Sequence, residues 1–401
     1  MSAPAHAPSD VADARRHAVA LTAGIFVVAY GTNVSTPFLV VYKERQGLSQ
    51  SATMAIFVVY VLGILGTLLI AGPLSDRFGR RPIVVPMVAL SALASLVMIA
   101  GRDELRWLLL GRFLLGVVSG GVLGVGAAWL LELLGPGHEQ RAAMATVIMT
   151  FAGFGVGPPV SALFDWLVPA PLVVPYLVHA AITFVVVVAL LRVPETRPAR
   201  PRAVRVSLGV PVESRRTFLI VIVPAAIWVF AFPSTSFALF PVLVSDSVSA
   251  GKVAIAAGAG ALTAWSGLIT RPLVGRIGMR PALPVGMVMG VAGYAAGATA
   301  FASDSWPLVL VAAPLLGAAS GTISVGCLSL IGVMAGDDRR GALTSSFYLL
   351  AYPGMAMPLF VTSLGTVVST STALVGITSV AALCTVGVVA ASRSAAMPAT
   401  N

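Results

Sequence analysis

Charged residues are scarce in this sequence. They make up 10% of its 401 residues, against roughly 25% in a typical soluble domain. Hydrophobic residues make up 58%, and the mean hydropathy is +0.96. A water-soluble globule of this length would need far more polar surface, so the composition excludes an ordinary soluble fold. We infer that lipid surrounds most of the chain.

Cysteine and histidine are also rare. The two cysteines, Cys327 and Cys384, lie in apolar runs, which excludes a disulfide framework and favours small buried side chains. Three of the four histidines fall outside the apolar runs, which leaves little for a metal site. The sequence contains no nucleotide-binding loop, no HExxH and no catalytic triad pattern. We therefore expect no enzyme, no bound metal and no cofactor.

Lysine is nearly absent, since 23 of the 25 basic residues are arginine. Together with the many Ala, Gly and Val residues, this bias indicates a high-GC bacterial genome. The net charge of +10 could suggest a nucleic-acid partner, but the basic residues lie in short clusters between apolar runs, without interleaved aromatics. Such clusters orient a membrane protein. We expect a multi-pass protein of the bacterial cytoplasmic membrane that binds no nucleic acid.

Twelve apolar runs are long enough to cross a bilayer, for which about 20 residues are needed. The predicted spans are 17–41, 53–71, 82–101, 105–133, 142–167, 172–191, 216–243, 253–271, 281–301, 306–335, 341–367 and 371–391. The first run is too long for a signal-peptide core and lacks a clear cleavage site, so we interpret it as an uncleaved helix. The expected fold class is all-α integral membrane, with twelve transmembrane helices in two pseudo-symmetric six-helix bundles.

A polar stretch divides the chain near its middle. Residues 192–215 are rich in Pro and Arg, which disfavour a continued helix and keep the segment in water. We predict a cytoplasmic linker here, between a bundle at 17–191 and a second bundle at 216–391. Cytoplasmic tails are expected at 1–16 and 392–401.

The basic residues also predict the orientation. With the N-terminus inside the cell, the inside segments hold 19 basic residues and the outside loops hold five. One further basic residue, Arg112, lies within a span. This bias follows the positive-inside rule and places both termini in the cytoplasm.

The two halves of the chain repeat. GPLSDRFGRRP at 72–82 aligns with RPLVGRIGMRP at 271–281, an offset of 199 residues. LGVVSGG at 115–121 aligns with LGAASGT at 316–322, an offset of 201 residues. Two parallel repeats of six spans are typical of a transporter built from two halves.

The loop GPLSDRFGRRP resembles the signature between the second and third helices of the major facilitator superfamily, and with the repeat and the span count this resemblance covers the whole chain. The matching residues are Gly72, Asp76, Arg77, Gly79, Arg80 and Arg81. The two glycines suit a tight turn. In that family the loop latches the cytoplasmic side of the two halves, which implies a coupling or gating role. The second copy has Gly275 in place of Asp76, so we expect a one-sided latch. The alternative is that the arginines only set the topology.

Arg112 lies about five residues into the fourth predicted span. A charge at membrane depth costs at least ~2.5 kcal/mol on insertion scales, so it normally faces a bundle interior. The segment LLLGRFLLGVVSGG is similar to the family's fourth-helix motif, whose arginine is linked to proton coupling or substrate, although Leu115 replaces the usual Gln. The alternative is an arginine that snorkels to the interface.

The segment GFGVGPPVSALF in the fifth span resembles the antiporter motif of the family through Gly153, Gly157 and Pro158. Small residues allow close helix packing, and Pro kinks the span. The motif implies export. Ser161 and Ala162 replace a further glycine pair, and an ordinary packing face is the alternative.

The sequence gives few candidates for the residue that would couple transport to an energy source. The first helix lacks the carboxylate that many relatives carry there. The candidate proton carriers are Asp165 near the outer end of the fifth span, His179 in the sixth and Glu132 at the inner end of the fourth. An interfacial or packing role is the alternative for each. Coupling to protons is implied by the resemblance only.

In the family, helices one, four, seven and ten line a cavity between the halves, near mid-membrane. The resemblance implies a substrate site built from Tyr30, Asn33, Arg112, Ser119, Trp228, Phe232, Phe237 and Ser320. Aromatic walls with few charges suit an amphipathic ligand. For each aromatic side chain, packing against lipid or a neighbour is the alternative.

These expectations describe a secondary active transporter that exports a small amphipathic molecule, a drug or secondary metabolite, by alternating access. The resemblance to the drug/proton antiporter branch implies a proton gradient as the energy source and a link to multidrug or antibiotic resistance. We expect a functional monomer whose partners are the lipid bilayer, the small molecule and protons. An importer or facilitator of a sugar, amino acid or other nutrient is the first alternative. A membrane enzyme or a receptor without transport is the second.

Overall fold

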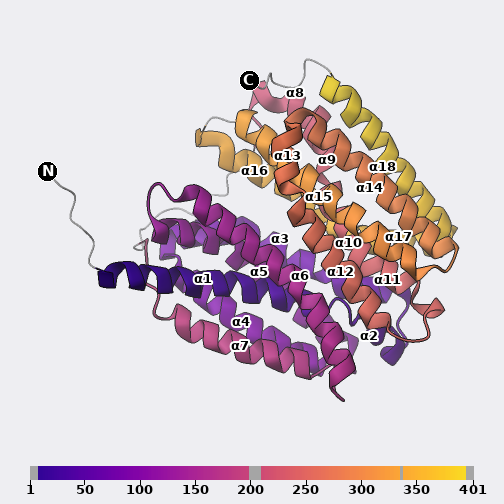
Figure 1. The fold of residues 1–401 in the computed structure, drawn as a ribbon, viewed down its shortest axis with the longest axis horizontal. Coiled ribbons are helices and arrows are strands. Elements are labelled where there is room, and N and C mark those ends of the chain that lie inside the picture. Colours follow the sequence, from indigo (N-terminus) through magenta and orange to yellow (C-terminus); the bar gives the residue numbers. More distant parts are fainter. Residues whose placement is uncertain (1–7, 198–208, 335–336, 394–401) are drawn as a thin grey trace. The chain divides into compact units, whose positions relative to one another are not determined.

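The computed structural model describes residues 8–197, 209–334 and 337–393, which form helices joined by short loops (Figure 1). Among these residues, eleven helices are long and apolar enough to cross a membrane, and a twelfth, Val174–Leu190, is apolar but shorter. The all-α membrane fold with about twelve spans is therefore confirmed. The predicted linker falls partly on residues 198–208, which lie outside the described part of the chain.

The first half contains seven helices. They are α1 (Pro8–Val34), α2 (Leu39–Gln46), α3 (Gln50–Phe78), α4 (Arg81–Ala100), α5 (Leu105–Leu134), α6 (Glu139–Leu167) and α7 (Val174–Leu190). The helix α2 continues the first span beyond a short break at residues 35–38. It ends at Gly47, whose φ of +61° suits a residue without a side chain.

The second half begins with an irregular span. Residues Val212–Leu243 form one apolar helical stretch, in which π-helical turns interrupt the α-helix. The consecutive pieces are η1 (Val212–Ser214), α8 (Arg215–Thr217), η2 (Phe218–Ile222), α9 (Val223–Ala226), α10 (Trp228–Ser234), η3 (Thr235–Leu239) and α11 (Phe240–Leu243). Pro224, Pro233 and Pro241 lack the N–H that a regular α-helix needs, which accounts for the interruptions.

The remaining elements complete the second half. They are η4 (Ser245–Ser247), α12 (Lys252–Ile269), α13 (Arg271–Ile277), α14 (Met279–Ala302), α15 (Trp306–Met334), α16 (Asp337–Ala351), η5 (Tyr352–Ala356), α17 (Met357–Val368) and α18 (Thr370–Arg393). The eleventh predicted span is thus broken at its middle, where η5 carries Pro353 and Gly354. Interrupted spans of this kind are frequent near the binding sites of transporters.

The helices cluster into two compact units. Unit 1 holds the described residues of Met1–Asn33, Leu62–Gly157 and Ala170–Val206, and unit 2 holds those of Val34–Val61, Pro158–Pro169 and Ser207–Asn401. Two segments of the first half therefore belong to unit 2 with the second-half helices. One contains α2 and the start of α3, and the other contains the end of α6.

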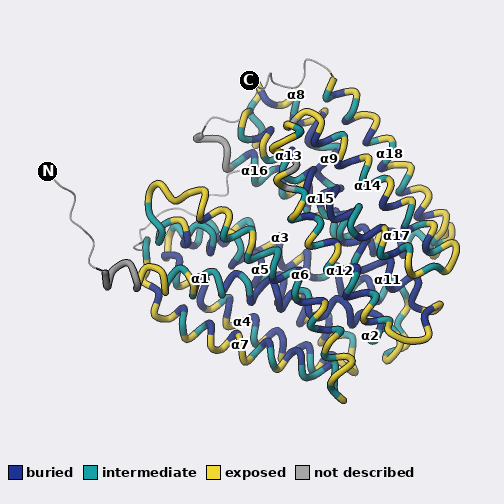
Figure 2. Tube along the Cα trace, viewed as in Figure 1, coloured by how far each residue is buried: buried dark blue, intermediate teal, exposed yellow. Residues whose placement is uncertain are grey.

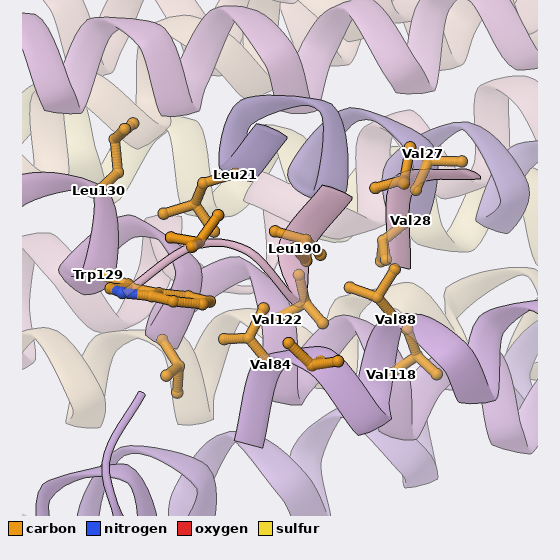
Figure 3. Close-up of a cluster of buried hydrophobic side chains, with 14 of the residues drawn as sticks. Leu21, Val27, Val28, Val84, Val88, Val118, Val122, Trp129, Leu130 and Leu190 are labelled. Atoms are coloured by element: carbon orange, nitrogen blue, oxygen red, sulfur yellow. The ribbon is translucent and has the colours of Figure 1, made fainter. Parts of the chain in front are cut away.

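A branched aliphatic core holds unit 1 together. Val28, Val84, Val118 and Leu190 meet there from α1, α4, α5 and α7 (Figure 3). At one end of this core Trp129 is fully buried, and its indole N–H donates to the carbonyl oxygen of Pro194 at 3.2 Å. Exposed residues lie along one side of α7 and of α18 (Figure 2). Many of these residues have large apolar side chains, as expected for a surface that faces lipid.

The same close helix contact occurs once in each half. A Cβ atom at Gly153 would lie 2.6 Å from the carbonyl oxygen of Phe26, so α6 and α1 touch backbone to backbone. Gly354 stands 201 residues later and approaches the carbonyl of Ile227 still more closely. Ile227 itself stands 201 residues after Phe26. The repeat predicted from the sequence is therefore present in the packing of the helices.

Candidate functional site

Arg80 is the centre of a charged cluster between α3 and α4. Its side chain is almost fully buried, and its guanidinium contacts Asp76 at 2.9 Å and Glu132 at 2.9 Å. Asp76 lies one helical turn before it on α3, whereas Glu132 lies at the end of α5. One buried arginine therefore neutralises carboxylates from two helices, which compensates the cost of placing charge here.

The residues that follow α7 complete this cluster. Arg197 contacts the Asp76 carboxylate at 3.1 Å, and the Thr196 hydroxyl donates to Glu132 at 2.6 Å. Glu195 accepts the backbone N–H groups of Arg80 and Arg81 at 3.0 and 2.8 Å. A carboxylate is favoured at this place because the first N–H groups of α4 have no partner within the helix.

Glycine is needed at one of the two predicted turn positions. Gly79 has a φ of +100°, and a Cβ atom there would lie 2.6 Å from the Glu195 carboxylate. Gly72 instead lies inside α3 with open space around it, so it makes no turn. Of the remaining motif residues, Arg77 covers the ring of Phe78 at 5.0 Å, and Arg81 donates to the carbonyl of Leu191 at 2.5 Å.

The predicted linker supplied a part of the site that sequence reasoning missed. Glu195, Thr196 and Arg197 belong to the stretch interpreted as a solvated linker. Glu195 binds the backbone between α3 and α4, Thr196 binds Glu132 of α5, and Arg197 binds Asp76 of α3. The available signal was the alternation of acid, hydroxyl and base directly after the sixth span. It complements the charges of Asp76 and Arg80.

Arg112 binds the end of α1. The side chain is 2% exposed, and its guanidinium donates to the carbonyl oxygen of Thr32 at 2.7 Å. The last carbonyls of α1 lack helical partners, because the helix ends at Val34. A cation at a helix C-terminus also meets the negative end of the helix dipole. Arg112 therefore faces the interior of unit 1 and does not snorkel to the interface.

Two hydroxyl groups reinforce the end of α1. Ser119 lies two turns along α5 from Arg112, and its hydroxyl is 3.2 Å from that of Thr32. Ser161 on α6 donates to the carbonyl of Val34 at 2.7 Å. Arg112 and Ser119 therefore both bind Thr32, just before the break in the first span.

The antiporter-like segment also packs on α1. Gly157 approaches the carbonyl of Tyr30 and the backbone of Asn33, so α6 lies directly on the last turn of α1. Pro158, the next residue, belongs to unit 2 and lies against Gly260 of α12, where a Cβ would be 2.9 Å away. The motif thus joins α6 to one helix of each half of the chain.

His179 lies in a satisfied hydrogen-bonding environment. It is fully buried on α7, with Nε2 3.1 Å from the carbonyl oxygen of Val27 and Nδ1 2.6 Å from the hydroxyl of Ser95. A nitrogen facing a carbonyl must carry the proton, and in the neutral ring Nδ1 then accepts from Ser95. The ring of Tyr30 lies 5.7 Å away. This geometry fits a neutral imidazole that bridges α1, α4 and α7.

Asp165 lies apart from these groups. It is exposed near the end of α6 and forms an ion pair with no described residue. Glu132, in contrast, forms an ion pair with Arg80 and accepts a hydrogen bond from the Thr196 hydroxyl. The structure therefore places the three candidate proton carriers in three separate surroundings.

Trp228 and Phe232 pack inside unit 2. Both are almost fully buried, with ring centroids 5.2 Å apart, and Phe232 lies over Gly290 of α14. Both rings also contact Tyr294 edge-on, at 6.0 and 5.0 Å. Ser320 donates to the carbonyl of Val229 at 2.6 Å, which ties α15 to α10. The structure gives these residues packing contacts, and their role as ligand contacts stays a prediction.

The opposite face of the seventh span carries a second aromatic group, which sequence reasoning missed apart from Phe237. The ring of Phe230 stacks on that of Tyr352 at 4.6 Å, and Tyr352 lies 5.9 Å from Tyr348. Phe237 meets Phe57 of α3 edge-on at 5.6 Å. Tyr60 lies one helical turn after Phe57 on α3. We call Phe57, Tyr60, Phe230, Phe237, Tyr348 and Tyr352 the aromatic cluster.

The two lysines of the protein form a pair of ion bridges in unit 2. Lys43 of α2 contacts Asp246 of η4 at 3.0 Å, and Lys252 at the start of α12 binds Glu44 of α2. Each bridge joins first-half and second-half residues more than 200 positions apart. With the contact of Pro158 and Gly260, these bridges tie one end of the first half to the second half. We call the four charged residues the lysine bridges.

Membrane helices that repeat their contacts in two halves, together with interrupted spans, are typical of secondary transporter folds. The sequence profile of the Major Facilitator Superfamily matches residues 21–359. The chain belongs to this family.

Curated relatives align over short stretches. The chain is 29% identical over 147 residues to the uncharacterized MFS-type transporter YfiU of Bacillus subtilis, which covers 36% of this chain and 28% of that protein. It is 32% identical over 88 residues to multidrug resistance protein MdtL of Klebsiella pneumoniae, 22% of each chain. It is 28% identical over 132 residues to polyamine transporter 4 of Saccharomyces cerevisiae, 33% of this chain and 20% of that protein. The chain thus spans less than a third of the length of these relatives.

Solved structures share the fold. A POT family transporter in complex with 5-aminolevulinic acid matches with a TM-score of 0.79 at 12% identity, covering 94% of this chain and 96% of that one. The nucleoside transporter NupG matches with a TM-score of 0.71 at 11% identity, covering 93% and 99%. At these identities the likeness shows the fold alone.

Proposed function

We propose that this protein exports a small amphipathic molecule from a bacterial cell by alternating access, driven by proton antiport. It does so as a monomer in the cytoplasmic membrane with both termini inside. The observation that carries the proposal is the tie between α2, α6 and the second-half elements η4 and α12. Small ion bridges and a glycine contact are reversible, as a gate that opens and closes requires.

The aromatic cluster supports the class of ligand. It lies where the seventh and eleventh spans are interrupted, and Phe230, Tyr348 and Tyr352 are each partly exposed. Flat rings with phenol groups provide apolar area and hydrogen-bonding positions without a fixed charge. Such a surface suits a planar amphipathic molecule better than a sugar or a free amino acid.

The direction of transport is supported by the antiporter-like motif. Gly153 and Gly157 bring α6 against α1, and Pro158 brings it against α12 of the second half. The motif is therefore part of the contact between first-half and second-half helices. MdtL, one of the relatives, is named for multidrug resistance. Proton coupling is proposed with Asp165 as the carrier, because it is the one candidate that is exposed and bound by no described ion partner.

Accumulation and growth in a pump-deficient bacterial host test this function. Expression should protect the host against some members of a panel of amphipathic toxins and dyes, and lower their level inside the cell. An uncoupler should abolish this difference. Tyr352→Leu should weaken protection, because it removes the central ring of the cluster. Phe184→Leu, on the exposed side of α7, serves as the matched control. Raised accumulation of any compound would instead identify an importer.

A further inference from the structure

A groove runs between the start of α1 and the end of α7, within unit 1. Its volume is about 420 Å³. The lining residues are Arg15, Arg16, Val19, Ala20, Ala23, Val185, Val186 and Ala189. Just beyond it, Gly24 of α1 contacts Leu190 of α7, which closes the groove at its base.

The walls of this groove face lipid. Val19 is 60% exposed and Val185 is 66% exposed, although both belong to helices of the membrane domain. Open valine side chains on helices this apolar are expected to be covered by hydrocarbon. A groove with apolar walls that opens toward hydrocarbon has the character of an acyl-chain site.

The mouth of the groove is basic. Arg15 and Arg16 are exposed one helical turn before Val19, at the point where the apolar stretch of α1 begins. Arg16 contacts Asp13 at 3.5 Å in an exposed pair, and Arg15 forms no ion pair with the acidic side chains described from residue 13 onward. Two guanidinium groups beside an apolar groove complement a lipid phosphate.

We propose that this groove binds one anionic phospholipid of the leaflet that faces the N-terminus. An acyl chain lies between α1 and α7, and the phosphate contacts Arg15 and Arg16. The occupant spans the contact between the first and sixth membrane helices, so its binding stabilises unit 1. The site is independent of the transported molecule, because none of its residues belongs to the aromatic cluster or to the lysine bridges.

The chain offers a matched control for the charges. Arg215 and Arg216 stand 200 residues after Arg15 and Arg16, at the start of the seventh span, and both are also exposed. The variant R15A/R16A removes the basic mouth, and R215A/R216A removes the equivalent charges of the second half. Ala189→Phe keeps both arginine pairs and fills the groove instead.

Native mass spectrometry of the purified protein with phosphatidylglycerol or phosphatidylcholine tests the site. We expect a bound phosphatidylglycerol that R15A/R16A weakens by about tenfold, and that R215A/R216A leaves in place. Ala189→Phe should also weaken it. Phosphatidylglycerol should raise the melting temperature of the unmodified protein and of R215A/R216A. It should not raise the melting temperature of R15A/R16A or of Ala189→Phe. Equal binding of both lipids, or equal losses in both arginine variants, would overturn the proposal.

Discussion

Arg80 shows how a single side chain can organise one end of this transporter. Its buried guanidinium binds the carboxylates of Asp76 and Glu132, while Glu195 binds the backbone of the same loop. The loop is therefore held by partners within unit 1, from α3, α5 and the segment after α7. Loss of Asp76 or Glu132 would leave the buried Arg80 charge with one carboxylate instead of two.

The substitution Asp76→Asn tests the cluster directly. It removes one negative charge shared by Arg80 and Arg197 but keeps the size of the side chain. We expect transport to fall several-fold while the amount of protein inserted in the membrane stays the same. Asp103→Asn is the matched control, because the pair of Asp103 with Arg102 is exposed and contributes little. A transport rate in Asp76→Asn equal to that of the unmodified protein would show that the charged cluster around Arg80 has no role in transport.

Gly354 lies too close to the backbone of the seventh span to carry a side chain. A Cβ atom there would collide with the backbone of Ile227 and Ala231 in the seventh span. We expect Gly354→Ala to destabilise the protein by about 1–3 kcal/mol, as overpacking typically does. The measurement is the melting temperature in detergent, with Gly376→Ala as the control because open space surrounds Gly376. A melting temperature equal to that of the control would contradict this packing.

At the scale of the helices, the apolar runs predicted the spans well, because lipid requires every spanning segment to be long and apolar. Hydropathy does not tell which side of a buried helix meets its neighbour. Trp228 and Phe232 were predicted to face the ligand; the structure shows that both contact α14, and their contact with a ligand stays a prediction. The ring of Phe230, two residues from each, stacks on Tyr352 instead. Phe237 was the one predicted aromatic that lies on this second face.

The break in the eleventh span explains why the cluster was difficult to predict. Tyr348 and Tyr352 stand at the junction of α16 and η5, and their position depends on the close contact of Gly354 with the seventh span. Contacts of this kind depend on tertiary packing rather than on local composition. The repeat of 199–201 residues would have pointed to Gly354 as the counterpart of Gly153.

The lysine bridges allow a charge-reversal experiment. Lys43 is 13% exposed and Asp246 is 74% exposed, so their bridge stabilises the tied end only modestly, by about 0.2–1 kcal/mol. Lys43→Glu should therefore shift the conformational population by roughly two- to fivefold toward an open end. Adding Asp246→Lys should reverse this shift by restoring an opposite pair.

Spin labels at Ser49 and Ser249, two exposed residues near the bridges, measure this population as a distance distribution. The single variant should gain a longer distance, and the double variant should lose it again. Identical distributions in all three proteins would show that the bridges do not hold this end.

At the scale of the whole molecule, the sequence predicted the class of protein more securely than its parts. Composition, repeat and the loop at residues 72–82 led to the family, which the profile over residues 21–359 confirmed. The residues of the candidate site were harder to predict from the sequence. Glu195 and Arg197, for example, lie in a segment whose charges were interpreted as solvated. The substrate and the direction of transport depend on how side chains are arranged in the folded protein, and both are proposals.

Proton-driven export is the central claim, and transport by purified protein in sealed vesicles tests it most directly. The measurement follows a planar amphipathic dye under an imposed pH gradient, with the protein oriented by its N-terminus. The dye should move uphill from the N-terminal side to the other side as protons return, and an uncoupler should stop it. Movement that only equalises the dye, or that ignores the pH gradient, would contradict the account.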